Sequence, residues 1–181
     1  EGKGRDADAL AFLRDELDYR NALIVELPKG DFGFTLTRQF LFSAHALVLT
    51  DALRSSNDAE LGGLAHKMHK ESRYHVRHSG DWMLRIGDGT EESHQRAQAA
   101  VNELWRYTGE LFMADDIERR LAAQGIAVDS SKLETPWRAQ VDDVLKRAGL
   151  TVPSVAWMQR GGRHGRHTEH LGHLLAEMQT L

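Results

Sequence analysis

The sequence has no cysteine and few prolines, and both absences narrow what the protein can be. Without cysteine there can be no disulfide and no thiolate metal site. This composition is compatible with a reducing cytoplasm, where we expect the protein to be localised. Only three prolines occur in 181 residues. Because proline interrupts helices, its scarcity favours long, continuous helices.

The chain also lacks a long apolar run and an excess of positive charge. No stretch of about 18 consecutive apolar residues is present, so we expect no membrane span and no membrane partner. The net charge is −4 at pH 7, whereas nucleic-acid binders usually have a clear basic excess, so we expect no nucleic-acid partner. Hydrophobic residues make up 41% of the chain, which is enough for a single packed domain over residues 1–181.

Periodic apolar residues predict four core helices, at about 6–26, 35–55, 58–86 and 91–112. Asp6 or Asp8 can cap the first of them, and Thr90 can cap the fourth. The second helix is apolar on nearly all sides, which is typical of a central, buried helix. Shorter helical patterns follow, and we expect them to form a C-terminal appendage over about 115–181. With no alternating pattern of a sheet and no internal repeat, the sequence predicts an all-α antiparallel bundle.

Ferritin-like bundles bind two irons through glutamates and Glu-x-x-His pairs that point inward, so we searched for that spacing. Glu16 is followed three residues later by Tyr19, and Glu71 is followed by Tyr74. Tyrosine is a poor iron ligand at neutral pH, because its phenol has a pKa of about 10 and stays protonated. His75 lies four residues after Glu71 and could share its helix face. A hydrogen-bonded Glu–His pair is the simpler interpretation of that spacing.

Other histidines also recur at helical intervals. His66 and His69 could bind zinc or copper, but the neighbouring lysines favour a solvated face. The three histidines of segment 167–173 follow at three-residue steps, and the outer two are about 9 Å apart along a helix, too far to share one ion easily. Glu169 and His173 repeat the four-residue spacing. A polar face or a partner contact is the simpler interpretation of this segment.

The segment RGGRHGR at 160–166 predicts a basic loop. Its arginines and free backbone amides could hold a phosphate. However, it has neither Walker nor dinucleotide-binding spacing, and a solvated loop or a contact with an acidic partner surface is the simpler interpretation. The chain has no Gly-x-Ser-x-Gly nucleophile motif.

Four long segments carry a resemblance to a known family, in the same order and over essentially the whole chain. They are ALIVELPKGDFGFTLTRQFLF, KESRYHVRHSGDWMLRIGDGTEES, LWRYTGELF and HTEHLGHLLAEMQ. Together they resemble the C subunits of bacterial phenylacetyl-CoA epoxidases, the ring-1,2-oxygenating complexes of phenylacetate catabolism. That family's chains are longer at both ends, so we expect an N-terminal helical segment to be missing here. Its absence would expose an apolar groove on the remaining helices.

The resemblance implies a ferritin-like fold and a subunit without its own cofactor. In this family the catalytic A subunit holds the di-iron centre and binds the CoA thioester, and electrons come from NADPH through a reductase subunit. The C subunit has lost the metal ligands and pairs with the A subunit as a structural partner. Further subunits of the complex are additional candidate partners. For this chain the resemblance implies no catalytic residue and no metal ligand, with Glu16, Tyr19, Glu71, Tyr74 and His75 at degenerate metal-site positions.

The sequence also gives an expectation for the surroundings of Glu71 and two alternative functions. A carboxylate in a bundle core without a metal must be neutralised, so Glu71 is expected near a buried basic side chain or hydrogen-bonded to Tyr or His. The candidate bases are Arg20, Arg38, Lys70 and Arg73. The alternatives to a structural subunit are a di-iron oxidase or oxygenase that uses Glu71, His75, Glu169 and His173, and a metal store that uses surface histidines.

Overall fold

The computed structural model describes residues 4–180 and contains no strand in that range. Its α-helices are α1 (Ala7–Ala11), α2 (Phe32–Leu53), α3 (Ala59–Gly87), α4 (Glu91–Leu104), α5 (Asp116–Ala123), α6 (Glu134–Arg147) and α7 (Glu169–Met178). Six short 3₁₀ turns lie between them. The all-α class expected from the sequence is confirmed, and the arrangement agrees with a ferritin-like fold.

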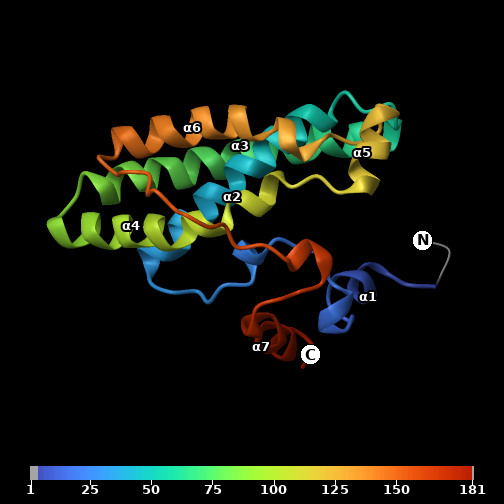
Figure 1. The fold of residues 1–181 in the computed structure, drawn as a ribbon, viewed down its shortest axis with the longest axis horizontal. Helices are drawn as coiled ribbons and strands as arrows, with labels where there is room; N and C mark the ends of the chain where they lie inside the picture. Colours follow the sequence, from blue (N-terminus) through green and yellow to red (C-terminus); the bar gives the residue numbers. More distant parts are fainter. Residues whose placement is uncertain (1–3, 181) are drawn as a thin grey trace.

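Helices α2, α3, α4 and α6 lie side by side along the long axis of the molecule (Figure 1). Three of them begin at side chains that accept a hydrogen bond from the first helical turn, which satisfies free backbone N–H groups. Asp31 caps α2, Asp58 caps α3 and Thr90 caps α4. The connections 54–58 and 88–90 are short, so α2, α3 and α4 run antiparallel.

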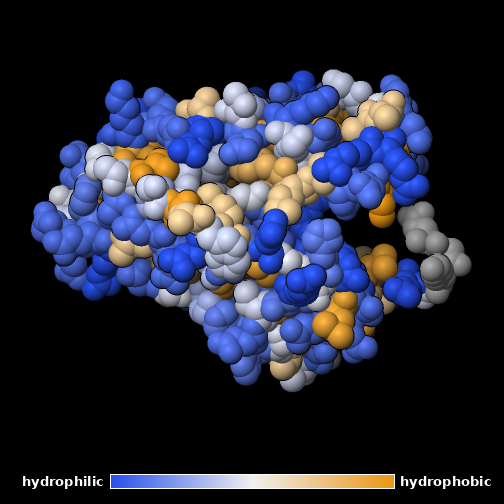
Figure 2. All heavy atoms as spheres, in the orientation of Figure 1, coloured by the Kyte–Doolittle hydropathy of each residue, from blue (hydrophilic) through white to orange (hydrophobic). Residues whose placement is uncertain are grey.

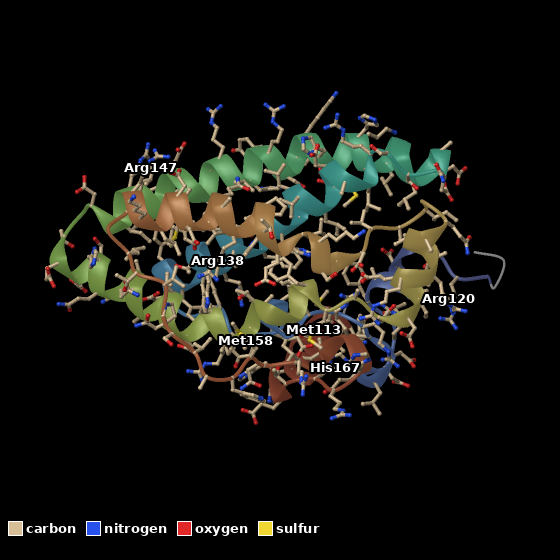
Figure 3. The ribbon with its side chains drawn as sticks, turned by 45° about the horizontal axis from the view of Figure 1, so that its top comes forward. Met113, Arg120, Arg138, Arg147, Met158 and His167 are labelled. Carbon is tan, nitrogen blue, oxygen red and sulfur yellow. The ribbon has the colours of Figure 1, made fainter. Side chains whose placement is uncertain are left out.

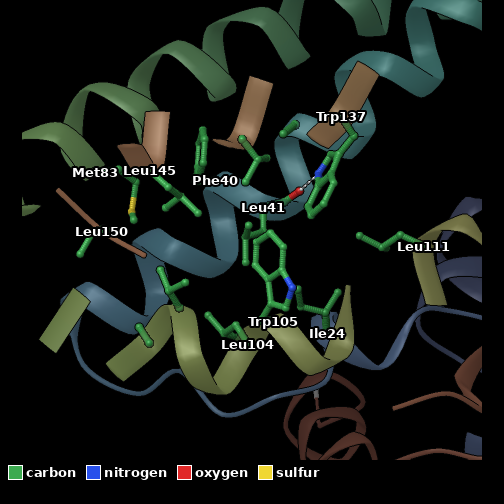
Figure 4. Packing of buried hydrophobic residues seen from close by; sticks show 14 of the residues in the cluster. Ile24, Phe40, Leu41, Met83, Leu104, Trp105, Leu111, Trp137, Leu145 and Leu150 are labelled. Atoms are coloured by element: carbon green, nitrogen blue, oxygen red, sulfur yellow. Dashed lines mark hydrogen bonds between the residues drawn. The ribbon is translucent and has the colours of Figure 1, made fainter. Parts of the chain in front are cut away.

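The core is centred on α2, as its apolar sequence predicts. Phe40 and Leu41 of α2 are fully buried, and the backbone carbonyl of Leu41 accepts a hydrogen bond of 3.0 Å from the Trp137 indole of α6 (Figure 4). The centroid of the Trp137 ring also lies 5.6 Å from that of Trp105 and 5.0 Å from that of Phe112. Helix α6 is therefore part of the core, and its assignment to a C-terminal appendage was wrong.

The helix expected over 6–26 is also wrong. Asp6 does cap a helix, but α1 ends after five residues, and two 3₁₀ turns, Glu16–Asp18 and Leu23–Val25, follow. Only part of the apolar face of the expected helix is buried, because Ile24 is fully buried but Leu13 and Leu17 are 64% and 70% exposed. Hydrogen bonds from this segment to distant parts of the chain replace those of a continuous helix.

The helix expected over 91–112 is shorter than predicted. α4 ends at Leu104, and two 3₁₀ turns cover Trp105–Tyr107 and Gly109–Phe112. Between them the Thr108 hydroxyl donates to the carbonyl of Trp105 at 2.8 Å, a local bond that competes with the helical ladder. Beyond the end of α4, the side chain of Glu110 is buried in the interior.

The face shown in Figure 2 is mainly hydrophilic, with separate hydrophobic spots. Within residues 4–180, none of the helices combines the length and the apolar character that a membrane span requires.

Candidate functional site

Glu71, Tyr74 and His75 lie on the solvent-facing side of α3. All three are exposed, whereas the buried stripe of this helix runs through Ser72, Val76 and other residues that pack on α2. Tyr74 is 64% exposed, and its ring lies 5.9 Å from that of His78 in a stacked geometry. The expectation that Glu71 is a buried carboxylate with a buried basic partner was therefore wrong.

The other degenerate positions lie elsewhere in the molecule. Glu16 belongs to the first 3₁₀ turn, beside α7, and its carboxylate approaches Gly172. The Tyr19 hydroxyl donates to the carbonyl of Ala11 at 3.0 Å. Because this segment and α3 lie on opposite sides of the molecule (Figure 1), the two Glu-x-x-Tyr sequences do not meet in one site.

The set proposed for a di-iron enzyme is not brought together either. Glu71 and His75 are exposed on α3, while Glu169 and His173 are exposed on α7 at the other side of the fold (Figures 1 and 3). Over residues 4–180, no three His, Asp or Glu side chains are arranged to hold a metal ion. These four residues do not fit a di-iron centre.

A cluster of buried polar side chains lies where the N-terminal segment meets the start of α7. Glu26 and His167 have fully buried side chains, and Oε1 of Glu26 is 2.7 Å from Nδ1 of His167. Oε1 also accepts from the Asn21 amide at 2.8 Å, and Oε2 accepts from the backbone N–H and the hydroxyl of Thr168 at 2.7 and 2.9 Å. Figure 3 shows His167 at this junction.

His167 has acceptors at both ring nitrogens. Nδ1 faces the Glu26 carboxylate, and Nε2 lies 3.1 Å from the carbonyl oxygen of Tyr19. Through its two ring nitrogens His167 connects the Glu26 side chain to the backbone at Tyr19. A buried Glu–His pair whose polar atoms all have hydrogen-bond partners avoids the cost of unsatisfied buried groups.

Glu110 anchors the basic loop at 160–166. Its Oε2 accepts from the backbone N–H of Leu23 at 2.9 Å. Its Oε1 accepts from the backbone N–H groups of Gly161 and Arg163 at 2.7 and 3.2 Å. The alternative of a phosphate held by free backbone amides does not apply to these two amides, because they already donate to a carboxylate of the same chain.

A small chamber adjoins this loop. It has a volume of about 210 Å³, and its polar lining includes His45, Glu118, Ser130 and Arg163. Glu118 Oε1 accepts from Arg163 at 2.6 Å and from the Ser130 hydroxyl at 2.9 Å. His45 Nε2 and Glu118 Oε2 are buried without a hydrogen-bond partner among the described residues. Burial lowers the pKa of His45 to about 4, although a backbone hydrogen bond at Leu111 opposes that shift.

Sequence reasoning missed Glu26 and Glu110 as buried groups. A signal was present, because Glu26 interrupts the apolar run LIVELP and Glu110 directly precedes the apolar residues LFM. A lone carboxylate among apolar neighbours is expected to find buried hydrogen-bond donors. What the sequence could not provide was the identity of those donors, most of which lie 51 to 142 residues away along the chain.

Comparison with known proteins agrees with the resemblance found in the sequence. The family described as phenylacetic acid catabolic protein matches residues 1–181. The chain is 46% identical over 180 residues to the C subunit of the 1,2-phenylacetyl-CoA epoxidase of Escherichia coli strain K12. That alignment covers 99% of this chain and 72% of the relative. The chain therefore belongs to the phenylacetic acid catabolic protein family.

Proposed function

We propose that this chain is a non-catalytic, structural subunit of a phenylacetyl-CoA epoxidase complex in the cytoplasm, and that it acts in phenylacetate catabolism. It would pair with a catalytic A subunit that holds the di-iron centre and receives electrons from NADPH through a reductase. The observation that carries the proposal is the 46% identity, over nearly the whole chain, to the C subunit of such an epoxidase.

The positions of the titratable side chains support a structural role. The buried carboxylates Glu26 and Glu110 are hydrogen-bonded to groups of the chain itself, so they join segments rather than face a substrate. On α3, Tyr74 stands where a Glu-x-x-His pair would need histidine, and its ring points to the surface. This arrangement favours a scaffold over a reaction centre.

Iron analysis tests the proposal directly. The chain would be purified alone and after co-expression with the A subunit of the same complex, and iron would be measured by elemental analysis. We expect no bound iron in the chain alone and about two irons per heterodimer in the complex. The double variant Glu71→Ala/His75→Ala serves as a control and should leave the iron content of the complex unchanged.

Two results would contradict the proposal. Failure of the chain to co-purify with the A subunit would remove the structural role. Stoichiometric iron in the isolated chain, lost in the Glu71→Ala/His75→Ala variant, would instead show that the chain holds a metal centre of its own.

A further inference from the structure

A long groove lies between α3 and α6, over the C-terminal half of α2. It consists of two adjoining cavities with volumes of about 610 and 720 Å³, and Leu47 and Arg73 line both. Along α3 the lining extends from His69 to Leu84, which is about 22 Å at 1.5 Å per residue. A groove of this length matches a helical segment of about 15 residues better than a compact small molecule.

The floor of the groove is apolar. It contains partly buried side chains that also pack against the core, namely Leu47, Val48, Leu84, Val128 and Val144. A partner that covers this floor removes apolar surface from water, which is favourable.

Among the charged side chains that line the groove, basic ones predominate. There are five basic residues, Lys70, Arg73, Arg77, Lys132 and Arg147, and three acidic residues, Asp51, Asp81 and Asp143. This excess is opposite in sign to the net charge of the whole chain, which is −4. The groove therefore attracts negatively charged groups.

Four of the five basic side chains are unpaired. Three of them, Lys70, Arg73 and Arg77, belong to α3. The fourth, Lys132, ends the 3₁₀ turn before α6. All four are exposed and form no ion pair with another residue of the described range 4–180.

Two of the three acidic side chains are already paired. Asp51 forms an ion pair with Arg54 at 2.7 Å. Asp143 pairs with Arg147 at 3.3 Å, and Figure 3 shows Arg147 near the C-terminal end of α6. An acidic occupant would therefore meet the cations of α3 without first displacing either of these carboxylates.

The unpaired cations of α3 recur at the helical interval. Arg73 follows Lys70 by three residues and Arg77 follows Arg73 by four, so the three side chains project on one side of the helix. Charges spread over about 10 Å match carboxylates at the same interval on a second helix, rather than a single anion. Tyr74, 64% exposed, also lines this part of the groove, and tyrosine and arginine are enriched at protein interfaces.

We propose that this groove docks an acidic, amphipathic helix of the catalytic A subunit. The apolar side of that helix covers the floor around Leu47 and Val144, and its carboxylates pair with Lys70, Arg73 and Arg77. The inference rests on the proposed function, which supplies the partner. It adds the surface through which the two subunits meet and the charge that the partner's surface must carry.

The affinity of the full chain for the A subunit, measured by titration calorimetry at about 0.05 and 0.3 M salt, tests the proposal. We expect the affinity to fall as the salt concentration rises, because salt screens exposed charges. The variant Lys70→Glu/Arg77→Glu should weaken binding about tenfold or more, because its new carboxylates face those of the partner. The control Arg106→Glu/Arg120→Glu makes the same change of charge at two exposed positions outside the groove and should bind as the unmodified chain does.

A milder variant separates an effect on docking from a loss of fold. Lys70→Gln/Arg77→Gln removes the two charges without reversing them, so it should weaken binding less than Lys70→Glu/Arg77→Glu does. An unchanged affinity in both groove variants, or an equal loss in the control, would overturn the inference. Binding of inorganic pyrophosphate that Lys70→Glu/Arg77→Glu abolishes, with an unchanged affinity for the A subunit, would assign the groove to a small anion instead.

Failure of this inference can be distinguished from failure of the proposed function. An unmodified chain that does not co-purify with the A subunit would remove both. A chain that co-purifies equally well with and without the Lys70→Glu/Arg77→Glu change would retain its structural role and lose only the groove assignment.

Discussion

Individual buried charges determine how the two ends of this chain are held against the bundle. Glu26 and Glu110 together accept hydrogen bonds from the backbone N–H groups of Leu23, Gly161, Arg163 and Thr168. Each of these bonds satisfies a backbone N–H group that has no partner within a helix. Removing such an acceptor leaves buried donors without partners, which is the costly outcome.

Replacing Glu110 with glutamine should destabilise the fold by about 2 kcal/mol or more. An amide group has only one acceptor oxygen, so its NH₂ must face either the Leu23 N–H or the loop amides. The exposed Glu103 on α4 provides the matched control, and Glu103→Gln should have almost no effect. Urea unfolding followed by circular dichroism would measure both, and equal midpoints for the two variants would contradict the expectation.

His45 should make stability depend on pH. Its pKa is about 4 in the folded protein, compared with 6.5 for an ordinary histidine, because burial disfavours the charged ring. As the pH falls through 6.5 the unfolded chain takes up this proton before the folded chain does, so stability is lost between pH 6.5 and 4. The full loss is about 3 kcal/mol.

The variant His45→Leu should lose this component of the pH dependence. Unfolding free energies measured from pH 7 to pH 4 should fall less steeply for the variant than for the unmodified chain. Parallel curves over that interval would show that His45 is not responsible.

At the scale of whole elements, the main difference from the sequence prediction is that α6 belongs to the core. It contributes Trp137, Val141 and Leu145 to the core. Its amphipathic pattern indicated a helix but not its neighbours. The N-terminal segment shows the opposite outcome, because a pattern typical of one long helix forms instead a short helix and two 3₁₀ turns.

Truncating Trp137 to alanine should cost about 3–5 kcal/mol, because it removes a large buried ring and leaves the Leu41 carbonyl without its donor. Lys146→Ala, on the exposed side of α6, is the control and should be nearly neutral. Thermal unfolding would compare the two. A small effect of Trp137→Ala would mean that α6 contributes little to the core.

At the scale of the whole molecule, a four-helix layer carries a second layer made of the N-terminal segment, the loop 160–166 and α7 (Figure 1). Polar contacts hold this second layer together. The Gln179 amide, for example, donates to the carbonyls of Phe12 and Arg14 at 2.7 and 3.0 Å. Such a layer is expected to open locally at lower free energy than the apolar core.

Hydrogen exchange should show that the layer opens as a unit. His167→Ala leaves the buried Glu26 side chain without one of its hydrogen-bond partners, which costs about 1–3 kcal/mol. We expect faster exchange over both 15–27 and α7, with α2 and α4 unchanged. His173→Ala, on the exposed face of α7, is the control. Faster exchange confined to α7 would show that the two segments are not coupled.

The sequence by itself determined the all-α class, the approximate bounds of α2 and α3, and the family. Those features depend on local periodicity, on capping residues such as Thr90, and on long matching segments, all of which are written along the chain. Only the tertiary structure decided that α6 belongs to the core, that Glu71 faces solvent, and that Glu26 meets His167. The reason is that these contacts join residues far apart in sequence, and local patterns do not encode which distant groups will meet.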